Sequence, residues 1–237
     1  MFIKKALHFI RLYAFIPLFF VVIGIICYIP EIFVAKDYAN SSFAESWDNS
    51  IASLPETSQY LGVYTEKTMY SPTRHLIFCD NKDNNVIFFA VDARGVTSVS
   101  YSKDEIACVT DSQLTEIFNY KIGTEDTPYT IESQEAYSYK NFWARDLYIL
   151  EEPNISYIGK IKSDPPNKET SLIFEKRSGK KVTLLSVDHI GLHKIDTFCY
   201  KEQVSYSKDV FKNIYVKIDD KAYILKYIDN NVKLKKR

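Results

Sequence analysis

Glycine is scarce in this sequence, and the glycine-dependent motifs of several large enzyme classes are missing. Only seven of the 237 residues are glycine. There is no G-x-S-x-G nucleophile elbow, no phosphate-binding P-loop and no G-x-G-x-x-G dinucleotide fingerprint. The zinc-protease motif H-E-x-x-H is missing as well. The motif content therefore favours a non-catalytic protein that needs no cofactor, although it does not exclude an enzyme.

An excess of charge of either sign is also missing. Lys plus Arg and Asp plus Glu each number 30, which gives a formal net charge of +0. Because nucleic-acid-binding domains usually carry a clear basic excess, we expect no nucleic acid partner. Hydrophobic residues make up 46% and charged residues 25%, which is typical of a folded domain and not of a disordered chain.

Cysteines are few and lack the spacing of metal ligands. Cys27 lies in an apolar N-terminal run, and Cys79, Cys108 and Cys199 are spread along the rest of the chain. No C-x-x-C pair is present, so no cysteine-based zinc site is indicated. In an oxidising compartment there is room for one disulfide among these three cysteines, with one thiol left over. The sequence does not choose among the three pairings.

One long hydrophobic run is present, at the N-terminus. Residues 12–30 (LYAFIPLFFVVIGIICYIP) contain no charged side chain. A helix of this length spans about 28 Å, close to the thickness of a bilayer's hydrocarbon core. Lys4, Lys5 and Arg11 precede the run, so the positive-inside rule places residues 1–11 in the cytosol. We expect a single-pass anchor in the lipid bilayer of a bacterial inner membrane, with the bulk of the chain in the periplasm.

A cleaved signal peptide is the alternative interpretation of this run. The apolar region of a signal peptide is about 7–15 residues long and is followed closely by a small-x-small cleavage site. Here the best such site, Ser42-Phe43-Ala44, lies well beyond the apolar run and after several charges. An uncleaved anchor is therefore favoured.

Beyond the anchor, the pattern predicts a mainly β (α+β) protein. Ser42 to Glu45 has the residues of a capping box, and apolar side chains recur at near-helical spacing to Leu54, so we expect a short amphipathic helix. Helical spacing returns near 111–118 and 135–150. Elsewhere short apolar runs alternate with polar turns, as in an antiparallel meander. The expected strands are 59–64, 74–79, 86–91, 96–101, 156–162, 171–176, 181–187, 192–200, 210–218 and 221–228.

These patterns divide the chain into five parts. At the C-terminal end we expect a frayed tail that contains four basic residues, Lys233, Lys235, Lys236 and Arg237. The five parts are a cytoplasmic basic stub (1–11), the transmembrane anchor (12–30), a membrane-proximal neck with the short helix (31–56), a first β-unit with C-terminal helices (57–154) and a second β-unit (155–237).

The two β-units contain an internal repeat. Residues 75–96 (HLIFCDNKDNNVIFFAVDARGV) align without a gap over residues 171–192 (SLIFEKRSGKKVTLLSVDHIGL), at a constant spacing of 96. We therefore expect two tandem, related antiparallel β-units. The hexapeptide VSYSKD also occurs twice, at 99–104 and 204–209, but its spacing of 105 indicates either a coincidence or an insertion in the second unit. The identical positions in the repeat are Leu76, Ile77, Phe78, Val86, Val91, Asp92 and Gly95.

Two tetrapeptides at matching positions of the repeat, 92–95 (DARG) and 188–191 (DHIG), carry an aspartate first and a glycine last. Paired carboxylates would be a functional interpretation. Asp at the first and Gly at the fourth position are, however, preferred in a type I turn, and each tetrapeptide follows a strand that ends in Val. We expect both to be turns.

Asp188, His189 and His193 form the one group in the sequence that resembles a metal site. Residues four apart share a face of a strand, so two imidazoles and a carboxylate could bind zinc with one position open. Against this, Gly191 is expected to interrupt the strand between the histidines. A metal-dependent hydrolase that uses these three residues is thus one hypothesis for the function.

A non-catalytic binding protein is the first hypothesis, because small β-rich domains without catalytic motifs usually bind a partner through edges, loops or exposed aromatics. An immunity-like inhibitor of a toxin or partner protein fits this design. An accessory or assembly component of a bacterial envelope complex is the alternative, and it differs in having a permanent protein partner.

Overall fold

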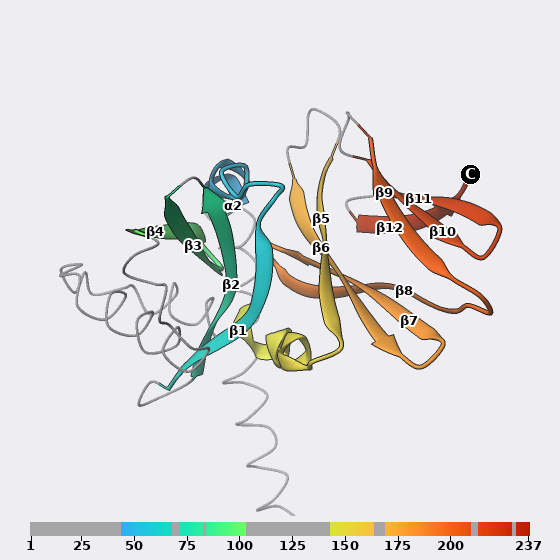
Figure 1. Cartoon of the computed structure of the whole chain (residues 1–237), viewed down its shortest axis with the longest axis horizontal. Coiled ribbons are helices and arrows are strands. Elements are labelled where there is room, and N and C mark those ends of the chain that lie inside the picture. Colours follow the sequence, from blue (N-terminus) through green and yellow to red (C-terminus); the bar gives the residue numbers. More distant parts are fainter. Residues whose placement is uncertain are drawn as a thin grey trace, which may run out of the picture.

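The structure, a computed structural model, describes residues 44–67, 72–82, 84–102, 143–163, 169–209, 213–228 and 231–237. They form three antiparallel sheets and two short helical segments (Figure 1). The prediction of a mainly β (α+β) fold is confirmed. The predicted anchor at 12–30 and the predicted helix at 111–118 lie outside these ranges. Among the described residues, no helix combines the length and the apolar character needed to cross a membrane.

Each sheet is a four-stranded meander in which a strand pairs with the next one along the chain. The helical segments α2 (Ala44–Ile51) and η2 (Arg145–Glu151) precede sheets A and B. Sheet A contains β1 (Gln59–Lys67), β2 (Pro72–Lys82), β3 (Asn85–Asp92) and β4 (Gly95–Ser102); sheet B contains β5 (Ile155–Lys162), β6 (Thr170–Ser178), β7 (Lys181–Asp188) and β8 (Gly191–Cys199); sheet C contains β9 (Val204–Lys208), β10 (Ile214–Ile218), β11 (Lys221–Ile228) and β12 (Asn231–Lys236).

Sheet C contains two strands, β9 and β12, that the sequence pattern does not predict. β12 pairs with β11 from Asn231, opposite Ile228, to Lys236, opposite Tyr223. The prediction that the basic C-terminal residues form a frayed tail is therefore wrong. Val232 is buried and Leu234 is half-buried at alternate positions of β12, so one face of the strand packs against the protein while Lys233 and Lys235 face outward.

The two copies of VSYSKD lie on strands that do not correspond. Residues 99–102 belong to β4 in sheet A, whereas residues 204–208 form β9 in sheet C. The repeat places β8, not β9, at the position equivalent to β4. The hexapeptide match is thus not part of the repeat, and the insertion that it suggested is not needed.

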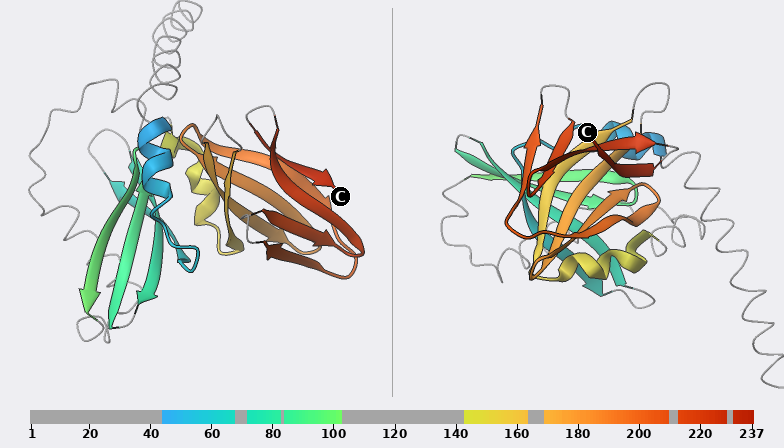
Figure 2. Two further views of the ribbon diagram at one scale, coloured as in Figure 1. Left: turned by 90° about the horizontal axis from the view of Figure 1, so that it is seen from above. Right: turned by 90° about the vertical axis from the view of Figure 1, so that its right-hand side faces the viewer.

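Sheet B is the middle layer of the molecule, with sheet A on one side and sheet C on the other (Figure 1; Figure 2). Strand β6 shows why: Leu172 and Phe174 pack with residues of sheet A, while Ile173 between them packs with residues of sheet C. Because successive side chains of a strand point to opposite faces, a strand covered on both sides reads as a continuous apolar run. The sequence SLIF of β6 has this character.

Sheets A and B share the same strand order, and their first three strands share the same register, while β7–β8 contains a register shift between Leu184 and Leu185 that β3–β4 lacks. A β-bulge after Tyr60 in β1, which ends at Gly62, recurs after Tyr157 in β5, where it ends at Gly159. Residues at matching positions of the repeat also have matching partners. The paired positions are Leu76–Val91 and Leu172–Val187, Phe78–Phe89 and Phe174–Leu185, and Asp92–Gly95 and Asp188–Gly191.

The correspondence extends to the helical segments. Trp47 and Trp143 are buried, lie 96 residues apart and meet edge to face, with ring centroids 5.8 Å apart. Figure 1 shows α2 and η2 at opposite ends of the contact between sheets A and B. Three pairs of core residues in and beside these two segments have the same spacing as the strands: Trp47 and Trp143, Ile51 and Leu147, and Leu54 and Leu150.

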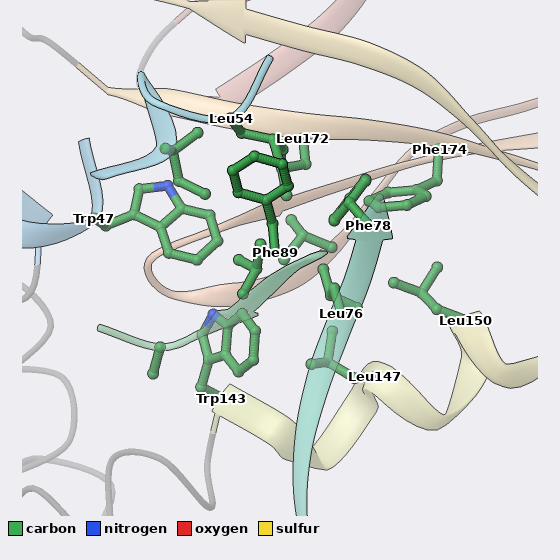
Figure 3. Close-up of a cluster of buried hydrophobic side chains, with 14 of the residues drawn as sticks. Trp47, Leu54, Leu76, Phe78, Phe89, Trp143, Leu147, Leu150, Leu172 and Phe174 are labelled. Carbon is green, nitrogen blue, oxygen red and sulfur yellow. The ribbon is translucent and has the colours of Figure 1, made fainter. Parts of the chain in front are cut away.

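Four aromatic rings join the centres of sheets A and B, and their contacts are reciprocal. Tyr60 of sheet A meets Phe174 of sheet B with centroids 5.1 Å apart, and Tyr157 of sheet B meets Phe78 of sheet A at the same distance. Such reciprocity is the pattern of two copies related by a two-fold axis. Phe78 and Phe174 have no measurable exposure, and Figure 3 shows them side by side in the buried cluster.

The outer face of sheet A carries a separate buried cluster of Cys79, Val86, Phe88 and Ala90. Val86 and Phe88 occupy the positions that correspond to Val182 and Leu184 of sheet B. In sheet B these positions pack against sheet C. The two related sheets therefore use the same outward positions for apolar packing.

Replacement of Gly95 by alanine is expected to destabilise the protein more than the same change at Gly62. Both glycines have a positive φ, +125° and +140°, which costs an alanine about 1–3 kcal/mol. At Gly95, however, a Cβ atom would lie 1.7 Å from Ser50 Oγ of α2, while at Gly62 it would meet nothing within 4 Å. We expect Gly95→Ala to cost at least about 1 kcal/mol more in urea unfolding. Equal costs would show that the contact with α2 is not restrictive.

Candidate functional site

The structure brings Asp188 and His193 together. Asp188 ends β7, and its Oδ1 accepts hydrogen bonds from the backbone N–H groups of Ile190 (2.8 Å) and Gly191 (3.3 Å). The same oxygen lies 3.2 Å from Nε2 of His193 on β8. The carboxylate therefore closes the turn and forms an ion pair with the protonated imidazole. Its hydrogen bond with Asp188 raises the pKa of His193, although burial opposes this shift.

His189 lies in the same turn but in a different environment. It is buried, and its imidazole interacts electrostatically with the carboxylates of Asp48 and Glu169. Burial raises the pKa of both carboxyl groups, and His189 opposes the shift. Within the described ranges, no three His, Cys, Asp or Glu side chains are close enough to hold a metal ion. Zinc binding by Asp188, His189 and His193 thus stays a prediction for which the geometry offers no support.

The corresponding turn of sheet A has the same construction. Oδ1 of Asp92 accepts the backbone N–H of Arg94 at 2.8 Å, and the Arg94 guanidinium reaches Oδ2 at 3.0 Å. Burial acts to raise the pKa of Asp92, but the charge of Arg94 and these hydrogen bonds bring it below its usual value. The prediction that both tetrapeptides are turns is confirmed, and each aspartate is used to close its own turn.

The two cysteines that the structure describes lie in different sheets. Cys79 is a free thiol in the outer cluster of sheet A, and Cys199 is a free thiol exposed at the end of β8. Burial raises the pKa of the Cys79 thiol, which disfavours the reactive thiolate. Cys108 lies outside the described residues. No disulfide therefore joins Cys79 to Cys199.

The C-terminal end of helix α2 is capped by a lysine from another element, and no sequence pattern marks this lysine. Lys160 of β5 has a buried side chain whose Nζ donates hydrogen bonds to three backbone carbonyls: Ile51 (3.1 Å), Ala52 (3.2 Å) and Leu54 (2.6 Å). The last carbonyls of a helix have no partner within the helix, and a cation there also interacts favourably with the helix dipole. Lys160 thus ties the end of α2 to sheet B.

Lys160 also breaks the symmetry between the two halves. The Tyr60 hydroxyl donates to the carbonyl of Leu150 at 3.1 Å, which closes the end of η2. At the equivalent position of the other half, the carbonyl of Leu54 accepts from Lys160, and the hydroxyl of the equivalent tyrosine, Tyr157, has no hydrogen-bond partner among the described residues. Burial raises the pKa of both tyrosines well above the usual value.

Helix α2 is also held near its middle by the first residue of β6. The Trp47 indole N–H donates to the carbonyl of Thr170 at 2.8 Å, and Asp48 Oδ1 accepts the Thr170 N–H at 2.6 Å. On the η2 side, Arg74, at the position equivalent to Thr170, donates to the carbonyl of Ala144 at 3.2 Å. Each helical segment is thus bonded to the second strand of the other sheet.

These contacts and the turns give Lys160, Trp47, Asp48 and Asp188 structural roles, although some buried polar atoms of the described residues, among them Ser58 Oγ and the Tyr157 hydroxyl, have no hydrogen-bond partner. Of the predicted site residues, Asp188 and His193 meet, while His189 lies near the carboxylates of Asp48 and Glu169, and Asp188 also acts electrostatically on Glu169. The sequence does contain one signal for the helix contacts, because Trp47 and Trp143 share the spacing of the repeat.

Comparisons of the chain with models of known protein families, with curated proteins and with solved structures found no match.

Replacement of Lys160 by methionine is expected to lower the free energy of unfolding by about 2–3 kcal/mol, because the carbonyls at the end of α2 lose their donor in a buried setting. Lys208→Met is the matched control. Lys208 is more exposed, and its Nζ pairs with Glu56 at 3.1 Å, so we expect a loss below about 1 kcal/mol. Urea unfolding of both variants measures the difference, and similar losses would contradict the role of Lys160.

The pair of His193 and Asp188 is expected to make stability depend on pH. Because the pKa of His193 is raised in the folded state, its contribution is fully present below the unfolded value of about 6.5 and is lost as pH rises through the folded value. Since the pair is partly exposed, we expect His193→Gln to cost about 0.5 kcal/mol at about pH 5.5 and less at about pH 8. Urea unfolding at the two pH values tests this, and a larger cost at the higher pH would contradict it.

Proposed function

We propose that this chain is a single-pass protein of a bacterial inner membrane whose periplasmic part binds a protein partner without catalysing a reaction. Residues 12–30 supply the anchor in this proposal, supported by their lack of charge and by the basic residues before them. The described residues supply the binding domain, a stack of three sheets.

The observation that carries the proposal is the use of the buried polar groups. Lys160 and Trp47 tie α2 to sheet B, and Asp188 closes a turn. Groups that are engaged in this way are held in place by hydrogen bonds that a reaction would have to break. A rigid scaffold with fixed polar groups suits recognition by its surface better than chemistry in its interior.

Two forms of this function follow from the design. An immunity-like inhibitor meets its toxin or target only on challenge, whereas an accessory component of an envelope complex keeps its partner at all times. Cross-linking in unstressed cells separates them, since only the permanent component gives a stable adduct under those conditions.

We also propose that the first two sheets arose by tandem duplication. The support is the shared register of the first three strands of sheets A and B, the shared bulges, and the common spacing of Trp47 and Trp143. On this view one unit comprises residues 44–102 and the other residues 143–199, each a helical segment followed by a meander. Sheet C is an addition to the second unit, which it covers on its outer face.

The anchor is expected to be retained in the mature protein. N-terminal sequencing of the protein purified from membranes should begin before Leu12, and protease added to spheroplasts should digest the domain that follows the anchor. A matched control carries Lys or Arg residues after residue 30 in place of those before residue 12, which should invert the topology. A mature sequence that begins near Glu45, or a domain that protease reaches only after lysis, would contradict the proposal.

A further inference from the structure

The outward face of sheet C carries a concentration of basic side chains that the neutral net charge of the chain conceals. Alternation along β10 turns Ile214, Val216 and Ile218 toward sheet B, which leaves the residues between them outward. The same alternation applies to β11 and β12. Within the described strands β9 to β12, none of the outward positions carries an acidic residue. The basic face consists of Lys217, Lys226, Lys233, Lys235 and Arg237, all of them exposed.

Two of these lysines lie directly opposite each other. Lys226 of β11 pairs with Lys233 of β12 in the register of the sheet. Side chains at directly opposed positions have Cβ atoms about 4.5–5.5 Å apart, and like charges there repel. An acidic residue at either position would turn the repulsion into attraction.

The middle of the basic face is aromatic and apolar. Tyr215 of β10 lies opposite Ile224 of β11, and both are half-buried. The guanidinium of Arg237 lies over the Tyr215 ring, 5.3 Å from its centroid, and reaches it across the small side chain of Ala222. The Tyr215 hydroxyl donates to Asp209, which lies just beyond β9 at the rim of the face. Tyrosine and arginine at the centre with lysines around them match the composition of a protein interface.

We propose that the basic face of sheet C binds an acidic surface of a partner protein, an inference that deepens the proposed function and rests on it. Anionic lipid is the less suitable ligand, because the most exposed large apolar side chains of the described residues, Leu61, Tyr148 and Ile190, lie on other elements and do not accompany the lysines into a bilayer. Single-stranded nucleic acid calls for several stacking rings, and Tyr215 is the one aromatic residue at the outward positions of the described strands of sheet C.

The test uses the full chain reconstituted in phosphatidylcholine vesicles. Three anionic probes are compared: a fluorescein-labelled Glu-rich peptide, separate vesicles that contain phosphatidylglycerol, and a single-stranded oligonucleotide. We expect the peptide to bind best and its affinity to fall as salt rises from about 50 to 500 mM. Lys226→Glu should weaken peptide binding at least about tenfold.

Lys194→Glu is the matched control, since Lys194 is an exposed lysine on β8 of sheet B and the charge change is the same. It should leave peptide binding within about twofold of the wild type. Lys226→Glu should at the same time raise the urea midpoint, because the new carboxylate would face Lys233 across the two strands. A stability gain joined to a binding loss is a combination that misfolding does not produce.

Preferential binding of the vesicles or of the oligonucleotide would overturn the inference, as would an equal loss of peptide binding in Lys194→Glu. The test of the anchor's topology and the test of the basic face can fail independently of each other. Should protease mapping place the domain in the cytosol while Lys226→Glu still abolishes peptide binding, the proposed location fails and the binding face stands. Should the topology agree while the peptide fails to bind, the binding face alone is wrong.

Discussion

The reciprocal packing of four aromatic rings is the contact on which the rest of the structure depends. Tyr60 and Phe78 of sheet A meet Phe174 and Tyr157 of sheet B at the centre of the interface. Each ring contact contributes about 0.5–1.5 kcal/mol beyond the burial of its area. Without this contact the inner faces of sheets A and B would be exposed to water. The helical segments would also lose their hydrogen bonds to the opposite sheet. Sheet C depends on it indirectly, because it packs on the back of sheet B.

A pair of related units does not make a symmetric molecule, and the differences between the units gather in one region. In the second unit, the bulge glycine Gly159 lies against the side chain of Lys208 from sheet C, and Lys160 beside it closes α2. In the first unit, the equivalent Gly62 has open space around it. The buried hydroxyl of Tyr157, which has no partner among the described residues, belongs to the same place. The asymmetry is thus concentrated where the third sheet packs on the second unit.

Most of the fold could be predicted from the sequence, because strand alternation and turn residues are local signals. The strands of sheets A and B and the turns at Asp92 and Asp188 follow from such signals. β12 could not be predicted in the same way, because its lysines resemble a solvated tail, and only the packing of Val232 and Leu234 on the protein makes it a strand. In the candidate site, the meeting of Asp188 with His193 follows from the turn. The role of Lys160 does not, because it depends on where α2 ends in space.

The spacing of the aromatic contacts has a consequence for how the chain is made. Phe78 and its partner Tyr157 are separated by most of a domain's length of chain, and contacts of such sequence separation form slowly. At a translation rate of about 5–20 residues per second, the first meander leaves the ribosome several seconds before its counterpart exists. During that interval its aromatic face has no internal partner. Because the two units present related aromatic faces, the unpaired first meander of one chain has the same packing requirement as the second meander of another, which is the condition for domain swapping between neighbouring chains.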